Sequence, residues 1–284
     1  MKDLDLIKND EYLKELITRS KLPDFYLEDN YNAFLRVCNS RALCRGCNGL
    51  EECRQPSKGE RLALDYDGVL IEEIEYCRYG QVAKDKQDLL SRYVYCDVAA
   101  NLAGLDLENV KYTDDQKQLY LLLAALYHGK REKGLYITGD LGVGKTYLCT
   151  AMANSLVKAG KKVAFVKVSN FFNEMRSAIG TSPELIDKNI NILKKAEYLF
   201  LDDIGAESVS EFIRDDILFR ILDYRLENSL ITIFTSNLNK SDLLKHYQYD
   251  RKEKANLMNA KRLLERIDIL SDDYVLTGNN LRRK

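Results

Sequence analysis

Residues 139–146, GDLGVGKT, combine three glycines, a lysine and a hydroxyl in one short segment. Their spacing matches the phosphate-binding pattern G-x-x-x-x-G-K-[ST], between an apolar strand-like run and a helical one, as that pattern requires. The glycines let successive backbone N–H groups turn toward phosphate oxygens, and the start of the helix adds partial positive charge. Lys145 would reach the β- and γ-phosphates, and Thr146 would bind Mg²⁺. The segment therefore predicts a nucleoside triphosphate site.

The alternative is a glycine-rich turn that only joins a strand to a helix, and the full pattern in its context disfavours it. The residues that we expect around the nucleotide are Gly139, Asp140, Leu141, Gly142, Val143, Gly144, Lys145, Thr146 and Tyr147.

Two further apolar runs end in polar side chains that suit hydrolysis. Tyr198–Leu201 is followed by Asp202, which would hold Mg²⁺ together with Thr146, and by Asp203, which would polarise the attacking water. A second run, IFTS, ends at Asn237, which would orient that water or touch the γ-phosphate because carboxyl ends of parallel strands meet at one crevice. Acidic strand ends are common, and a Ser-Asn turn is an alternative for Asn237.

Arginines four residues apart near the end of the chain form a separate candidate. Arg262 and Arg266 would lie on one face of a helix. An arginine that reaches a neighbouring subunit's γ-phosphate makes hydrolysis depend on assembly. The alternative is an ordinary solvated helix face.

The cysteines are concentrated before residue 80. Cys44 and Cys47 have the C-x₂-C spacing of a zinc site, and we predict Cys53 and Cys77 as the other ligands of a structural Zn²⁺, with Cys38 as an alternative fourth. The histidines, at 128 and 246, are out of range, and the competing reading is idle buried thiols. An odd count of seven cysteines without a secretory signal indicates reduced thiols and a cytoplasmic protein, and no segment is long enough to span a membrane.

The order of the apolar runs indicates how these side chains are positioned. A helix is expected at 4–20 and a strand at 69–79. From residue 114, helical segments alternate with strand-like runs at 135–139, 162–168, 198–205 and 230–237, and a last helix is expected near 253–269. Alternation of this kind predicts an α/β domain with a parallel sheet covered on both faces. We expect a small α/β zinc-binding domain at 1–95, a linker at 96–112 and an ATPase domain at 113–284.

The chain resembles the AAA+ ATPases of the DnaC/DnaI type, which load the replicative helicase in bacteria. The resemblance rests on four motifs that follow one another along the chain: GDLGVGKT, LFLDDIGAE, IFTSN and RLLERI. The resemblance covers about residues 105–284, and the cysteine-rich N-terminus is similar to that of the DnaI branch. It implies a P-loop core with sheet order 5-1-4-3-2 and no helical lid. It also implies that Lys145, Asp202, Asp203 and Asn237 are catalytic, that Arg266 is the arginine finger with Arg262 as a lesser candidate, and that Arg282 is a poor match to a second sensor. Asp203 stands where many AAA+ proteins have Glu, which predicts weak hydrolysis.

The resemblance also implies partners. These are the hexameric replicative helicase, contacted by the N-terminal domain, single-stranded DNA, further copies in a ring or spiral, and other primosome proteins. The net charge of −1 does not by itself indicate nucleic-acid binding. For DNA we consider Phe171, Phe172 and Arg176, where aromatic rings would stack on bases, although a place in the core is the stronger expectation for the phenylalanines.

The function that we predict is therefore an ATP-dependent loader that delivers the replicative helicase onto single-stranded DNA, with ATP, Mg²⁺ and Zn²⁺ as cofactors. One alternative is a transposition-helper ATPase with the same motifs, against which the zinc domain argues. The other is a nucleotide-switched scaffold with little turnover, against which the intact catalytic set argues.

Overall fold

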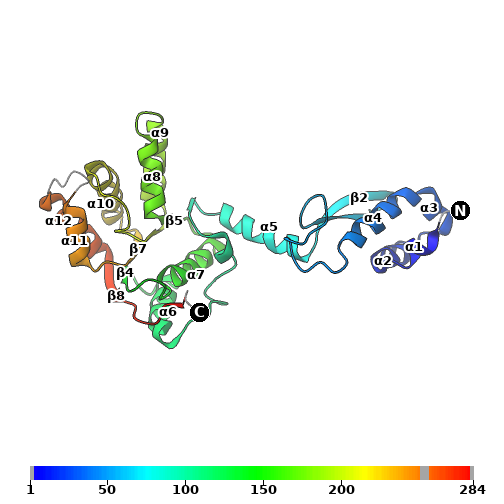
Figure 1. Ribbon diagram of the computed structural model, residues 1–284, viewed down its shortest axis with the longest axis horizontal. Helices are drawn as coiled ribbons and strands as arrows, with labels where there is room; N and C mark the ends of the chain where they lie inside the picture. The colour runs from blue at the N-terminus through cyan, green and yellow to red at the C-terminus, as the bar shows by residue number, and fades with distance from the viewer. Residues whose placement is uncertain (1–2, 250–255, 282–284) are drawn as a thin grey trace. The chain divides into compact units, whose positions relative to one another are not determined.

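The computed structural model describes residues 3–249 and 256–281, and the chain divides into two compact units, 1–87 and 88–284 (Figure 1). The division falls eight residues before the expected boundary at 95. The expected linker at 96–112 is not a linker, because this stretch packs within the second unit. Tyr95 and Cys96 pair with a strand of its sheet, and Val98 and Val110 are buried in its core.

The first unit packs short helices against a two-stranded antiparallel hairpin. Its core is formed by apolar side chains such as Ile7, Leu13, Phe34 and Leu64. The single helix expected at 4–20 is wrong: it breaks at Asn9 and Asp10, and the Asp10 carboxylate accepts the Leu13 N–H at 3.2 Å as a new N-cap. The elements are α1 (Leu4–Lys8), α2 (Glu11–Ser20), α3 (Asp24–Asp29), α4 (Tyr31–Leu43), β1 (Glu60–Tyr66), β2 (Leu70–Tyr76) and α5 (Arg78–Ser91), which continues into the second unit.

The second unit is built on a six-stranded sheet in which every pairing is parallel. The strand order is β3-β5-β6-β7-β4-β8. Counted from β4, this is the order 5-1-4-3-2 that was predicted, with β3 as an added edge strand beside β5. The strands are β3 (Tyr95–Cys96), β4 (Gly134–Thr138), β5 (Val163–Lys167), β6 (Tyr198–Asp202), β7 (Ile231–Ser236) and β8 (Ser271–Val275).

Helices cover both faces of this sheet, so its central strands are buried on both sides (Figure 1). One core contains side chains of α6 and α7, and the other contains side chains of α8 to α12. Within the described residues, no helical lid follows β8. The helical elements are η1 (Ala100–Leu102), α6 (Asp114–Tyr127), α7 (Lys145–Lys158), α8 (Val168–Ala178), α9 (Pro183–Lys195), the π-helix η2 (Phe212–Phe219), α10 (Arg220–Glu227), α11 (Lys240–Gln248) and α12 (Leu257–Leu270).

None of the helices among the described residues is both long and apolar enough to cross a membrane.

Candidate nucleotide-binding site

The glycine-rich loop joins the end of β4 at Thr138 to the start of α7 at Lys145. Gly139, Gly142 and Gly144 have φ values of 148°, 83° and 102°, which other residues rarely adopt. A Cβ atom at Gly139 would also overlap the carbonyl oxygen of Leu276. The local backbone therefore requires glycine, and it has the conformation in which N–H groups can surround an anion.

Lys145 is the buried cation of the loop. Only 5% of this residue is exposed, and its Nζ donates to the carbonyl oxygens of Gly139 and Asp140 at 2.7 and 2.9 Å. It also donates to Oδ1 of Asn237 at 2.8 Å. The sheet thus brings together a lysine and an asparagine that are 92 residues apart in the sequence, as expected for strands whose carboxyl ends meet at one edge.

Asp202, at the end of β6, faces the first residues of α7. Its Oδ1 accepts from the hydroxyls of Thr146 at 2.8 Å and Thr235 at 2.7 Å, and the residue is 4% exposed. Burial raises the pKa of Asp202, the Thr235 hydroxyl opposes that rise, and the negative charge of Asp203 adds to it. A buried carboxylate beside a hydroxyl supplies the hard oxygen ligands that Mg²⁺ prefers, and a bound cation would offset the desolvation of the carboxylate.

This raised pKa predicts an unusual pH dependence of Mg²⁺ binding. As pH falls from 7, Asp202 should be protonated before ordinary aspartates, and the Mg²⁺ affinity should drop about tenfold per pH unit once its pKa is passed. Asp203→Asn removes the neighbouring charge, so the drop should move to lower pH. The measurement is a Mg²⁺ titration with a fluorescent ATP analogue at several pH values. Comparing the two chains cancels the protonation of the nucleotide, and identical profiles would contradict the prediction.

Asp203 is half-buried and has a left-handed backbone, with φ of 57°. Its N–H donates to Oγ1 of Thr235 at 2.9 Å. An aspartate tolerates this conformation better than most residues, and such backbone strain is concentrated at functional sites. The turn after β6 therefore holds Asp202 and Asp203 in different environments, one buried against α7 and the other partly open.

The structure adds residues that the motifs did not reveal. Gln116, in the first turn of α6, is 2% exposed, and its Nε2 donates to the Val143 carbonyl at 2.7 Å. Its Oε1 accepts the Thr113 N–H at 3.0 Å, which completes a capping box. The spacing of Thr113 and Gln116 predicts the cap, but nothing in it indicates contact with the loop. Along the same loop, the Leu281 N–H donates to the Gly142 carbonyl at 3.0 Å.

Arg262 and Arg266 lie on α12, as their spacing predicts. Arg266 donates from Nε to Oδ1 of Asp223 at 2.9 Å and from Nη1 to Glu265, and both guanidinium groups lie over the ring of Phe219. Arg262 is exposed, whereas the Arg266 side chain is 22% exposed. Both cations are thus held on the α10–α12 surface. Arg282 lies outside the described residues.

The aromatic residues considered for DNA stacking are core residues. Phe171 and Phe172 are each 1% exposed, and both belong to the core on the α8 side of the sheet. Arg176 donates from Nη2 to the Ser208 carbonyl at 3.3 Å. Base stacking by either ring is therefore excluded in this conformation.

The four proposed zinc ligands fall into two pairs, Cys44 with Cys47 and Cys53 with Cys77. Gln55 donates to Sγ of Cys44 at 3.2 Å, and the Cys47 thiol donates to the Gly49 carbonyl. Cys53 and Cys77 both contact Gly59, whose N–H donates to Sγ of Cys53 and whose carbonyl accepts the Cys77 N–H. Among the described residues, no three His, Cys, Asp or Glu side chains are arranged to hold a metal. Cys38 is buried in the core of the first unit.

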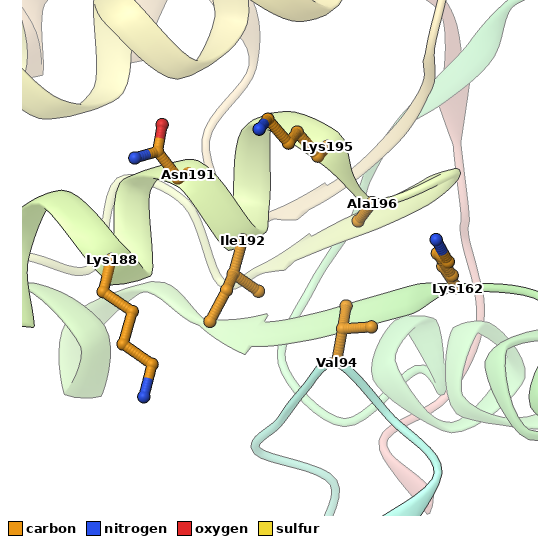
Figure 2. A pocket seen from close by; sticks show the side chains of 7 residues that line it. All are labelled: Val94, Lys162, Lys188, Asn191, Ile192, Lys195 and Ala196. Carbon is orange, nitrogen blue, oxygen red and sulfur yellow. The ribbon is translucent and has the colours of Figure 1, made fainter.

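An apolar groove bordered by lysines lies at the amino ends of the strands (Figure 2). It has a volume of about 420 Å³ and is lined by Val94 and Lys162, which precede β3 and β5, and by a face of α9 with Lys188, Ile192 and Lys195. These positions are at the amino ends of the strands, whereas the loop and Asp202 are at the carboxyl ends. Because it lies at the opposite ends of the strands, the groove is separate from the candidate catalytic site.

The fold and the site define a P-loop ATPase of the AAA+ class. A family model described as "IstB-like ATP binding protein" matches residues 82–284, and the chain belongs to this family.

Individual relatives extend the comparison. The chain is 28% identical to the replicative helicase loader DnaI of Bacillus subtilis (strain 168), over 99% of this chain and 90% of that protein. A crystal structure of DnaI superposes with a TM-score of 0.56 and 31% identity, over 66% of this chain and 98% of that one. A putative ATP-binding protein of insertion sequence IS1162 from Pseudomonas fluorescens is 29% identical over 50% of this chain and 59% of its own length.

Proposed function

We propose that this protein binds the replicative DNA helicase and, using ATP, delivers it onto single-stranded DNA. The observation that carries the proposal is the similarity to the helicase loader DnaI over 99% of this chain, which includes the first unit as well as the ATPase unit. The IS1162 relative is similar over only half of the chain. The family match at 82–284 leaves the first unit almost entirely outside. Similarity of the first unit to DnaI therefore favours a helicase loader over a transposition helper.

The described contacts support a hydrolytic mechanism. ATP would bind with its phosphates in the loop at 139–146, where Lys145 provides a positive charge and Asn237 lies against it. Mg²⁺, when bound by Thr146 and Asp202, would neutralise charge on the phosphates. Asp203 is the candidate base for the attacking water, and Asn237 would orient that water. Turnover is expected to be weak without assembly, because the candidate arginines lie on α12 rather than in the loop.

Arg266 of one subunit would complete the site of its neighbour in a ring or spiral, with Arg262 as the lesser candidate. The first unit would contact the helicase, and single-stranded DNA would stimulate turnover. Co-purification with the cell's own replicative helicase, with and without ATP, tests the proposal. Capture of the helicase that depends on ATP supports it, whereas capture of a transposase instead would favour the transposition helper. Turnover that stays negligible with helicase and single-stranded DNA would favour the nucleotide-switched scaffold.

We also propose a structural Zn²⁺ in the first unit, held by Cys44, Cys47, Cys53 and Cys77. Support comes from the cysteine spacing and from backbone N–H groups that donate to two of the sulfurs, as they do around bound thiolates. The Gly59 N–H lowers the pKa of Cys53, which favours the thiolate form. Binding would draw the two pairs of cysteines together, and metal binding of this kind contributes folding free energy.

The expected zinc content is about one atom per chain. Cys44→Ser and Cys77→Ser should each remove it, because three thiolates bind Zn²⁺ far less tightly than four. Cys96→Ser, in the second unit, is the matched control, and Cys38→Ser tests the alternative ligand. Metal analysis of the purified chains together with circular dichroism makes the measurement. A folded, metal-free wild-type protein would reject the assignment.

A further inference from the structure

A series of hydrogen bonds between buried and half-buried groups, one of them the backbone carbonyl of Tyr247, leads from the turn after β6 to α12. Glu207 is 3% exposed, and its Oε2 accepts the Gly205 N–H at 2.8 Å. Its Oε1 accepts from the hydroxyl of Tyr247, a residue with no exposed surface. A carboxylate and a phenol buried in an apolar core are unfavourable unless each is hydrogen-bonded, so this pairing holds the turn against α11.

The set continues through a buried arginine on the π-helix η2. Nη1 of Arg214 donates to the Tyr247 carbonyl at 3.1 Å, and Nε and Nη2 donate to the Asp215 carboxylate at 2.8 and 2.7 Å. Arg214 is fully buried. Burial opposes ionisation of Asp215, but the hydrogen bonds from Arg214 and Asn259 outweigh it and lower the pKa of Asp215. The buried guanidinium of Arg214 is therefore compensated by a carboxylate that is itself 30% exposed.

Asp215 makes the last link, to the helix that carries the arginines. Its Oδ2 accepts from Nδ2 of Asn259 at 2.9 Å, and Asn259 is in the first turn of α12. Further along α12, Arg262 and Arg266 rest on Phe219, the last residue of η2. One element, η2, therefore contacts α12 at its first turn and supports both guanidinium groups.

We infer that Glu207, Tyr247, Arg214 and Asp215 form a relay that positions the α12 arginines for the neighbouring subunit's nucleotide. The relay begins three residues beyond Ile204, in the same turn as Asp202 and Asp203, so the occupancy of a subunit's own site can bias the arginines it offers to the next. These are positioning residues, because none of them contacts the loop at 139–146. The inference rests on the proposed function, specifically on an arginine that acts between subunits.

A mixing experiment separates a failure of the relay from a failure of the arginine mechanism on which it rests. The recipient chain carries Arg266→Ala, so its own catalytic residues are intact but it offers no arginine. The donor chain carries Asp203→Asn, so it hydrolyses nothing but offers Arg266. If arginines act between subunits, mixing the two inactive chains restores ATP hydrolysis. If the mixture stays inactive, the arginine mechanism fails and the relay fails with it.

The relay is then tested by adding Tyr247→Phe to one chain at a time. In the donor chain it should reduce the restored rate about 2- to 30-fold, a range typical of residues that couple sites. In the recipient chain it should leave the rate unchanged, because the recipient's arginine is already absent. A reduction that is equal in both positions would indicate a general structural effect and overturn the relay, as would no reduction in the donor.

Two further variants protect the result from misfolding. Asn259→Ala breaks the last link at a half-buried position, and in the donor it should reproduce the effect of Tyr247→Phe. Tyr249→Phe removes a hydroxyl from an exposed tyrosine nearby and is the matched control. Each donor is first checked for unaltered thermal unfolding and unaltered affinity for a fluorescent ATP analogue. An inactive Tyr247→Phe donor with a fully active Asn259→Ala donor would contradict the proposed path.

Discussion

Lys145→Ala is expected to abolish ATP binding and with it every activity that depends on ATP. The ammonium of Lys145 is buried between two loop carbonyls and Asn237, so no other described cation occupies this position. Loss of its charge-assisted hydrogen bonds to phosphate should weaken binding by about 3 kcal/mol or more, which is at least ~100-fold. Isothermal titration of Mg-ATP makes the measurement.

Two controls accompany this variant. Lys161→Ala removes a lysine that is exposed and paired with Glu197, and it should bind ATP normally. The zinc content of Lys145→Ala should equal that of the wild type, because the loop belongs to the second unit. Heat of binding that matches the wild type in Lys145→Ala would show that the loop does not hold the triphosphate.

Arg266→Ala should reduce assembly-dependent hydrolysis by about 10³-fold while leaving nucleotide affinity nearly unchanged. An arginine that acts on the neighbour's γ-phosphate stabilises the transition state rather than the bound nucleotide, and arginines of this kind contribute rate factors of that order. The measurement compares single-turnover hydrolysis at saturating ATP with the affinity from equilibrium titration.

Arg262→Ala serves as the comparison, since Arg262 shares the contact with Phe219 but is more exposed. Arg266 is also held by Asp223, so its loss should slightly destabilise the packing of α12 on α10. Measurement of thermal unfolding separates that effect from catalysis. A larger loss of hydrolysis in Arg262→Ala than in Arg266→Ala would reassign the finger.

The parts of the fold with strong local signals were predictable from the sequence. The runs that became β4, β5, β6 and β7 are short, apolar and buried on both faces, and the resemblance to AAA+ ATPases implied their order in the sheet. β8 gave a weak signal because SDDYV mixes acidic and apolar residues, and four of its five positions are at least partly exposed. The hairpin strand β1 was not predicted, because apolar and polar residues alternate imperfectly in its sequence, ERLALDY.

Contacts between distant segments were harder to predict. The periodicity of residues 212–228 indicates a helix, but the wider turns of η2 accommodate Arg214, whose partners include Tyr247, 33 residues further along the chain. Gln116 could be assigned to a helix cap, yet its contact with Val143 depends on the packing of α6 against the loop. The sequence identified the residues with characteristic chemistry, whereas the residues that hold them required the tertiary structure.

The backbone contact between Leu281 and Gly142 has a practical consequence for handling the protein. A Cβ atom at Gly142 would overlap the side chain of Asn280, and Leu276 donates to the Thr138 carbonyl at 2.7 Å, so the stretch 276–281 follows the edge of the triphosphate cradle. A label or bulky substitution placed within 276–281 would therefore lie beside that cradle. Labels intended for nucleotide work are therefore better attached outside this stretch.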